Sequence, residues 1–300
     1  MPFVVDLCNY FANFVRGDGI CGIDCRPDMF NVTDKGNLEM RTEKIGKHSV
    51  EFYDAIDELP IVRFHKYQKL LLVDAGVGAD IAAFDQHIEK VRRYILDGKL
   101  PKAAKEVANL RQCVYLIQSG ISPQHLAFAT LVTKIDGRVC NDLTDDALSE
   151  IVKQLGDVPQ KKLTATFEAV KKKIDSELML YFPTLFNGSE IKEYYDLLKR
   201  RTLEILKGII EGLDNPMDGK EVERLTAALI TYSNPKSFEG SEGVEVQFDR
   251  QFENLCLVLS EQMHVEPKKY TVLEFYNAFD FVKERAKQAE KAQKRPVGAR

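Results

Sequence analysis

The chain has 300 residues, of which 44% are hydrophobic and 29% are charged, and its formal net charge is −4. This length and apolar fraction suffice for a substantial core, which excludes a wholly disordered protein, and the longest apolar runs are far shorter than the roughly 20 residues that span a bilayer. Acidic and basic residues are interleaved along most of the chain, so the composition provides no strong electrostatic field for nucleic acid.

The N-terminal part predicts a short amphipathic helix followed by an extended arm. Apolar residues recur at helical spacing over residues 4–15, and Asp6 breaks the uninterrupted apolar run that a signal peptide needs, so secretion by that route is not expected. Between residues 17 and 56, glycine and aspartate punctuate the sequence, and apolar residues alternate around Met40 and Phe52. We expect a small β-hairpin or an extended arm there.

The following segment predicts a series of helices. We expect them over residues 63–73, 80–96 and 101–118, from residue 123 to about 137, and from a start at residues 144–146. In two of these helices the apolar residues form a clear stripe, which we expect to fill the interior. The stripes are Ile81, Phe84, Ile88, Val91 and Ile95, and Ala104, Val107, Leu110, Val114 and Ile117.

Two longer stripes predict a helical hairpin. Apolar residues repeat in steps of three and four over 163–181, Pro183 ends that helix, and a second stripe occupies 189–212. We expect the two helices to pack as an antiparallel pair.

The last part of the chain predicts a smaller helical unit. A proline-bearing segment at 214–219 is the expected boundary, and Thr271 with Glu274 forms a capping box that predicts a helix start. From Lys283 to Arg300 there are seven basic and two acidic residues, which predicts a basic tail.

The expected organisation is therefore an N-terminal helix and arm (1–58), a helical core (59–213) and a C-terminal helical unit (214–300). The expected fold class is mainly α, a multi-helix bundle with a long helical hairpin and a small N-terminal extended or β arm.

The cysteines and histidines offer two candidate chemical sites. The six cysteines are too sparse for a disulfide framework, and Cys21, Cys25 and His48 lack the second thiolate pair of a typical zinc site. Cys113 and His125 could be a thiol nucleophile and its base, but nothing in the sequence near Cys113 predicts a lowered thiol pKa. We expect ordinary reduced thiols and core packing, with no catalytic residue, cofactor or metal.

Other polar motifs have simpler explanations. Gly76–Gly78 lacks the spacing of a phosphate loop and predicts a turn, and the carboxylates of residues 136–146 do not match a calcium loop. His87, with Asp85 and Glu89 beside it, is interpreted as a surface histidine. The basic runs 171–173 and 199–201 lie on helices that also carry acids and predict solvated faces.

Two stretches resemble proteins of tailed bacteriophages. The first comprises Leu59-Pro60-Ile61, Phe64-His65-Lys66-Tyr67, Asp74-Ala75-Gly76-Val77-Gly78, Ile121-Ser122-Pro123 and Ile135-Asp136-Gly137; the second is Tyr270-Thr271-Val272-Leu273-Glu274-Phe275-Tyr276. The second stretch is similar to helix starts in tail-assembly and other virion-morphogenesis proteins. The resemblance implies a structural or assembly role, and no catalytic residue is carried over from it.

The expected function is therefore that of a non-enzymatic, virion-associated structural or assembly protein that acts through protein–protein contacts. Its partners would be other virion or assembly proteins, with homo-oligomerisation left open, in the host cytoplasm or the virion and without a membrane. The candidate contact residues are Val4, Phe11, Phe52, Phe167, Tyr194, Phe275 and Phe279. Two alternatives are a nucleic-acid-associated protein that uses the basic runs and the tail, and a helical enzyme whose site includes His87 or His125.

Overall fold

The computed structural model describes residues 40–120, 122–186, 189–213, 216–232, 238, 240 and 243–293. These residues form two compact units, each built from separate stretches of the chain. Unit 1 contains Leu72–Ser122 and Pro183–Gln247, and unit 2 contains the described residues up to Leu71, Pro123–Phe182 and the described residues from Phe248 onward. This division differs from the three consecutive segments expected at 1–58, 59–213 and 214–300, because the segment 59–213 contributes to both units.

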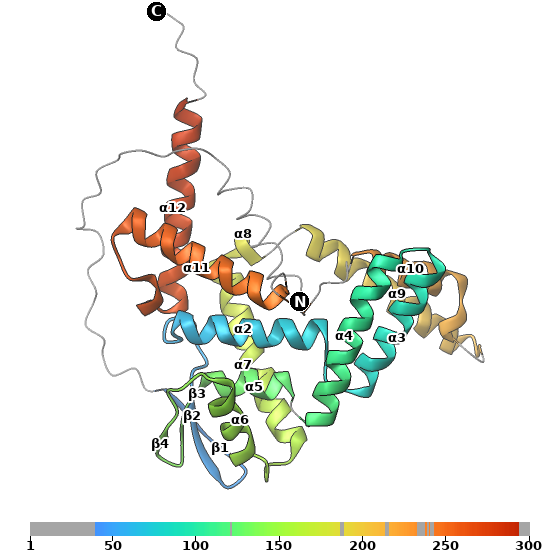
Figure 1. The fold of residues 1–300 in the computed structure, drawn as a ribbon, viewed down its shortest axis with the longest axis horizontal. Helices are drawn as coiled ribbons and strands as arrows, with labels where there is room; N and C mark the ends of the chain where they lie inside the picture. Colours follow the sequence, from blue (N-terminus) through green and yellow to red (C-terminus); the bar gives the residue numbers. More distant parts are fainter. Residues whose placement is uncertain are drawn as a thin grey trace, which may run out of the picture. The chain divides into compact units, whose positions relative to one another are not determined.

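The described chain is mainly helical, as expected, with one small sheet (Figure 1). Unit 2 contains β1 (Arg41–Ile45), β2 (His48–Phe52), α5 (Pro123–Leu131), β3 (Val132–Ile135), β4 (Arg138–Val139), α6 (Asp145–Gln154), α7 (Gln160–Tyr181), η2 (Pro267–Lys269) and α12 (Val272–Gln293). Unit 1 contains α3 (Ile81–Leu96), α4 (Leu100–Ser119), α8 (Pro183–Phe186), α9 (Ser189–Ile210), η1 (Pro216–Asp218) and α10 (Lys220–Tyr232). The division between the units falls within α2 (Ile61–Gly76) and α11 (Val244–Met263).

The sheet of unit 2 is antiparallel, with the strand order β1-β2-β3-β4. The expected β-hairpin is confirmed as β1 and β2. The helix expected to extend to about residue 137 ends instead at Leu131, and β3 and β4 follow it. Asp136 and Gly137 both have positive φ, 50° and 84°, as the two central residues of a tight type I′ hairpin turn require. The N-terminal hairpin is part of a larger sheet, since β2 pairs with β3.

The core of unit 2 is rich in aromatic side chains. The ring of Phe128 makes edge contacts with Phe52 and Phe167, at centroid separations of 5.6 and 6.5 Å. All three side chains are buried. They come from β2, α5 and α7, so this aromatic group joins the sheet to two helices.

A buried arginine links α2 to the segment that contains α5 and β3. The guanidinium of Arg63 donates hydrogen bonds to the backbone oxygens of Thr130, Val132 and Cys140, at 2.9, 3.0 and 2.7 Å. Carbonyl oxygens in the last turn of a helix and just beyond it would otherwise need water or another donor, and Arg63 supplies one inside the unit.

The start of α12 has the expected capping box. The Thr271 N–H donates to Glu274 Oε2 at 2.8 Å, and the Glu274 N–H donates to Thr271 Oγ1 at 3.3 Å. The residues on either side of Thr271 are joined to the start of α2. The Val272 N–H donates to the Leu59 oxygen, and the Ile61 N–H donates to the Tyr270 oxygen. The capping box therefore closes the first turn of α12, and these backbone bonds hold that turn beside the start of α2 in unit 2.

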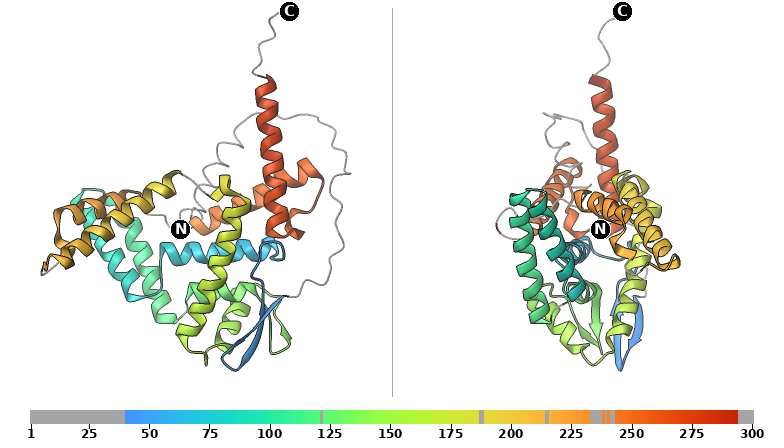
Figure 2. Two further views of the ribbon diagram at one scale, coloured as in Figure 1. Left: turned by 180° about the vertical axis from the view of Figure 1, so that it is seen from behind. Right: turned by 90° about the vertical axis from the view of Figure 1, so that its right-hand side faces the viewer.

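Unit 1 contains two pairs of helices that lie side by side, α3 with α4 and α9 with α10 (Figure 2). The helices expected at 163–181 and 189–212 are present as α7 and α9. Their expected pairing is wrong, because α9 pairs with α10 in unit 1, whereas α7 belongs to unit 2 and contacts α5 there.

Candidate functional site

The contact residues expected from the sequence are mostly interior residues. Phe52, Phe167, Phe275 and Phe279 are buried in unit 2, where a partner at the surface does not reach them. Their apolar character reflects core packing, and we do not retain them as contact residues. Tyr194 lies in α9, and Val4 and Phe11 lie outside the described residues.

The proposed thiol and imidazole belong to different units, and each is buried. Burial, with a smaller effect from Asp80, raises the pKa of the Cys113 thiol, which is the opposite of what a thiolate nucleophile needs. Burial also lowers the pKa of His125. The interpretation of both as core residues fits these environments. Cys21 and Cys25 lie outside the described residues.

The glycines of the segment 76–78 serve packing and turning. A Cβ on Gly76 would lie 2.1 Å from Phe238 Cζ, and Gly78 has a φ of +70°. The helix N-terminus that follows is capped by its own carboxylate, because Asp80 accepts a hydrogen bond from the Ala83 N–H at 2.7 Å. This arrangement agrees with a turn and leaves a negative charge where a phosphate would sit.

His48, considered above as a metal ligand, bridges two aspartates in unit 2. Its Nδ1 lies 2.6 Å from Asp136 Oδ2, and its Nε2 lies 3.1 Å from Asp157 Oδ1. The hydrogen bond with Asp136, helped by the one with Asp157, raises the pKa of His48 although burial opposes it. The bridge ties the β1–β2 turn to the β3–β4 turn and to the loop after α6.

His87 is a buried residue, and the interpretation of it as a surface histidine is wrong. The side chains of His87 and Glu106 are 3% and 2% exposed, and His87 Nδ1 lies 2.7 Å from Glu106 Oε1. His87 Nε2 lies 2.7 Å from the Val77 oxygen, and Lys90 Nζ lies 3.5 Å from Glu106 Oε1. Burial disfavours the charged form of Glu106, but the hydrogen bond from His87 and the charge of Lys90 outweigh it, so the pKa of this carboxyl is lowered.

This buried pair has the chemistry of an acid–base dyad but not its accessibility. A substrate must come within hydrogen-bond reach of a general base, and side chains this buried offer no such approach. The pair joins α3 to α4 and to the end of α2. The sequence does not predict this pair. Glu106 lies 19 positions after His87 on a neighbouring helix, and this separation is not diagnostic of any motif.

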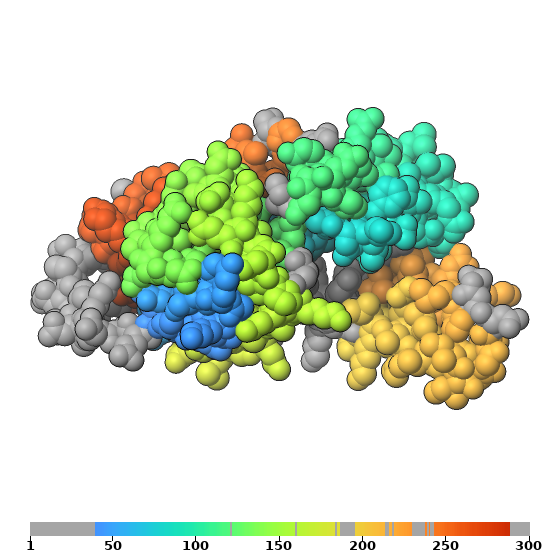
Figure 3. Space-filling view, turned by 90° about the horizontal axis from the view of Figure 1, so that it is seen from below, coloured from blue at the N-terminus to red at the C-terminus, as the bar shows by residue number. Residues whose placement is uncertain are grey.

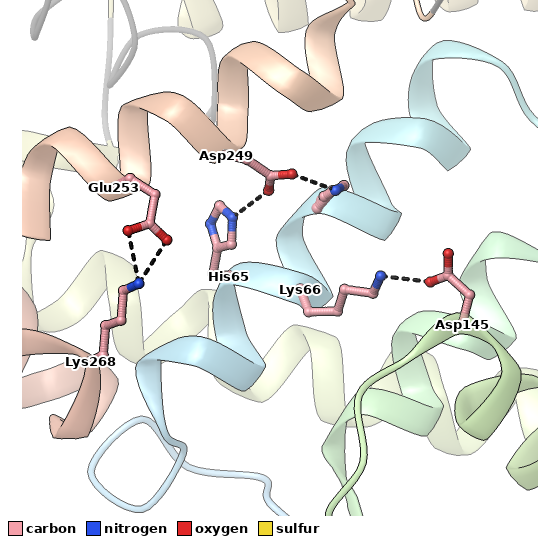
Figure 4. Close-up of polar contacts among 7 residues, drawn as sticks. His65, Lys66, Asp145, Asp249, Glu253 and Lys268 are labelled. Carbon is pink, nitrogen blue, oxygen red and sulfur yellow. Dashed lines mark hydrogen bonds and ion pairs between the residues drawn. The ribbon is translucent and has the colours of Figure 1, made fainter.

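A second polar group, on α2 and α11 in unit 2, is shown in Figure 4. The ring of His65 stacks on Phe248 and Phe252, at centroid separations of 4.5 and 4.1 Å. Its Nε2 lies 2.8 Å from Asp249 Oδ1, and Lys69 Nζ lies 2.7 Å from Asp249 Oδ2. Burial lowers the pKa of His65, with the Asp249 interaction opposing it.

Each oxygen of Asp249 already has a partner on α2, so the arrangement fastens α11 to α2. Two further ion pairs of Figure 4, Lys66–Asp145 and Lys268–Glu253, join α2 to α6 and η2 to α11. Within this group, His65 contacts Asp249, Phe248 and Phe252, and the Asp249 carboxylate that it contacts is also held by Lys69. Sequence reasoning missed this group, and the aromatic residues one helical turn apart at 248 and 252 were its only visible signal.

The basic runs are partly neutralised by neighbouring acids. Lys171 pairs with Glu168, Lys173 with Asp54, and Arg200 with Glu221, at 3.8, 2.9 and 3.9 Å. These pairings favour the interpretation of solvated faces over that of a phosphate-binding surface.

The least expected feature of unit 1 is the orientation of its apolar stripes. On α3 the buried residues are His87 and Tyr94, whereas Ile81, Ile88 and Ile95 are 72%, 45% and 54% exposed. On α4 the buried residues are Ala103, Glu106, Asn109 and Cys113, and the apolar stripe that starts at Ala104 is exposed or half-buried. The two stripes expected in the interior therefore lie at the surface, and both helices are seen there in Figure 3, in cyan and green.

Helix α9 also carries apolar side chains at the surface. Leu203, Leu206 and Ile210, spaced by three and four residues, are between 48% and 85% exposed. We call these three residues the α9 strip. Aligned exposed aliphatic residues of this kind are typical of protein–protein contact sites.

Comparisons with known proteins found no match in family models, in curated protein sequences or in solved structures. Within the described residues, no group of three or more histidine, cysteine, aspartate or glutamate side chains is placed to hold a metal ion. Over the same residues, no helix has the length and apolar character needed to cross a bilayer.

Proposed function

We propose that this protein is a non-enzymatic structural or assembly component that acts through protein–protein contacts made by unit 1. The observation that carries the proposal is the alignment of exposed aliphatic side chains on α3, α4 and α9. Exposing such residues in rows costs free energy in water, and a partner that covers them recovers it, at about 25 cal/mol per Å² of apolar surface.

The polar groups support the same proposal. The His87–Glu106 pair is buried, and both carboxylate oxygens of Asp249 are held by residues of α2. These groups fasten helices together inside each unit. A tailed-phage virion or tail-assembly setting, with other virion or assembly proteins as partners, is the part of the proposal that rests on the sequence resemblance alone.

The test is stoichiometric complex formation by the purified full-length chain. We expect the protein to form a defined complex, with itself or with a co-expressed assembly protein, and the L206S/I210S variant of the α9 strip to weaken it. K207S is the matched control, because Lys207 is exposed on the same helix and is polar. A protein that stays strictly monomeric and captures no protein in stoichiometric amount contradicts the proposal. Identification of captured partners by mass spectrometry tests the phage setting separately.

Over the described residues, no specific observation favours the nucleic-acid alternative. Residues of both internal basic runs pair with acids, as described above. A salt-dependent affinity for DNA, with the steep slope expected of multiple phosphate contacts, would favour that alternative over ours.

A further inference from the structure

The pair α3–α4 presents a row of exposed aliphatic side chains, with half-buried apolar residues between them. We define the α3–α4 apolar face by Ile81, Ile88 and Ile95 on α3 and by Val107 and Val114 on α4. The two helices meet through a different set of residues, since His87 of α3 bonds Glu106 of α4 and both side chains are buried. The contact between the helices is thus partly polar, and the apolar face lies to one side of it.

Helix geometry places both halves of this face on the same side. With about 100° per residue, the centre of the apolar stripe on α3 lies roughly 80° from the direction of His87, and that on α4 lies roughly 80° from the direction of Glu106, in the same rotational sense. Because α3 and α4 contact each other and are joined by a turn at Asp97–Gly98, they run in opposite directions. Equal rotation on antiparallel helices brings the two stripes to one face.

The spacing along the face is that of a helical bundle seam. Ile81, Ile88 and Ile95 are seven residues apart, with the half-buried Phe84 and Val91 between them. Val107 and Val114 repeat the same interval on α4, with Leu110 between them. Apolar residues in steps of three and four are the a and d positions of a heptad, which pack against facing helices. A two-helix hairpin with such a seam on one face is half of a four-helix bundle.

The charges beside the face indicate what covers it. Asp85 lies on the outer edge of the α3 stripe and Arg111 on the outer edge of the α4 stripe, and both are exposed. Neither forms an ion pair with any described residue. Glu89, on the same edge of α3, is already bonded to Arg92 at 3.0 Å. Arg92 lies on this edge too, so among the described residues the Glu89–Arg92 pair leaves Asp85 as the unpaired charge of the α3 edge, and Arg111 is the unpaired charge of the α4 edge. These two opposite charges make the face complementary to a second copy of itself.

We infer that the α3–α4 apolar face is a homodimer interface, in which the hairpins of two copies of this chain form a four-helix bundle. A two-fold axis parallel to the helices sets α3 of one copy against α4 of the other and brings Asp85 close to the partner copy's Arg111. A two-fold axis perpendicular to the helices would instead pack α3 of one copy against α3 of the other. Asp85 would then lie on the same edge as Asp85 of the second copy, so like charges would share that edge. Charge complementarity favours the parallel axis. This inference rests on the proposed function and names the partner.

The test uses sedimentation equilibrium of the full chain over a range of concentrations. We expect a monomer–dimer equilibrium whose dissociation constant rises about tenfold or more in I88E/V107E. K105E is the matched control, because Lys105 is exposed on α4 outside the apolar face, and we expect it to leave the dimer intact. Circular dichroism should be unchanged in each variant, since all three side chains are exposed in the single chain.

Charge reversal tests the arrangement directly. D85R and R111D should each weaken the dimer, and D85R/R111D should restore it towards the original dissociation constant. A folded chain that remains monomeric at all concentrations, a dimer unaffected by I88E/V107E, or a double reversal without rescue each overturns the inference. Failure here is distinct from failure of the proposed function, because a complex with another protein that depends on the α9 strip would still form.

Discussion

At the scale of single residues, His48 is a proton-dependent link between three loops. A neutral imidazole donates only one hydrogen bond, whereas the protonated ring donates to both Asp136 and Asp157. The folded-state pKa of His48 is raised above 6.5, so its contribution to stability is fully present below pH 6.5 and is lost as the pH rises through the folded-state value. We expect the stability difference between the wild type and H48Q to shrink as the pH rises from 6 to 9.

The measurement is denaturant unfolding at several pH values, together with an NMR titration of the His48 ring. D136N should shift the His48 titration to lower pH, because it removes the strongest hydrogen-bond acceptor of the ring. A His48 ring that titrates identically in the wild type and in D136N would exclude the bridge.

The buried pair of His87 and Glu106 has a larger expected effect on stability. Removing one partner leaves the other buried without the hydrogen bond that joins them, which costs about 3–5 kcal/mol. H87L and E106L should each lose about that much, whereas H87L/E106L should lose less than either single variant, since it leaves neither polar side chain buried without its partner. Urea unfolding of the four proteins gives the coupling free energy. Additive losses would show that the two side chains act independently.

The same pair predicts a response to acid. The folded-state pKa of Glu106 lies below 4.5, so its contribution to stability is present above pH 4.5 and is lost as the pH falls through the folded-state value. The acid-induced loss of stability should therefore be smaller in H87L/E106L than in the wild type. Equal acid sensitivity of the two proteins would contradict this assignment.

At the scale of elements, the capping box of α12 was readable because its signal is local. Thr271 and Glu274 satisfy each other's backbone N–H groups, and no distant residue is needed to predict that. T271A should cost about 1 kcal/mol. N277A, at an exposed position of the same helix, is the control and should change stability by less than about 0.5 kcal/mol. Thermal unfolding of both variants tests the prediction, which fails if they are equally stable.

The β3–β4 hairpin was missed although its signal was also local. Asp136–Gly137 was interpreted as a helix end, but an Asp-Gly pair between short alternating stretches is also the sequence of a type I′ turn. The preceding Leu131–Val132 is apolar and buried, so nothing in its hydrophobicity separates the end of α5 from the start of β3. Only the pairing with β2, distant in the chain, distinguishes the two interpretations.

The α3 and α4 stripes show what periodicity leaves open. The repeat correctly identified which residues share one side of each helix, but not what covers that side. The polar residues at 87 and 106 are buried because they bond to each other across two helices, and a single-helix pattern contains no information on such a pair. The pairing of α9 with α10 was likewise unreadable, because similar apolar stripes on three helices do not specify a partner.

At the scale of the whole molecule, the chain returns to each unit after passing through the other, so the stability of a unit depends on residues far apart in sequence. Phe128 tests this organisation because it is buried and contacts Phe52 and Phe167 within unit 2. F128A should destabilise unit 2 by about 3–5 kcal/mol through loss of apolar contact and creation of a cavity. Hydrogen exchange should then accelerate together in β2, α5 and α7, while α3 and α4 keep their protection.

The converse variant is V222A in unit 1, also at a buried position. Exchange should accelerate in α10, while β2, α5 and α7 keep their protection. If F128A instead accelerates exchange uniformly over both units, the two units unfold as one cooperative structure and the division has no energetic meaning.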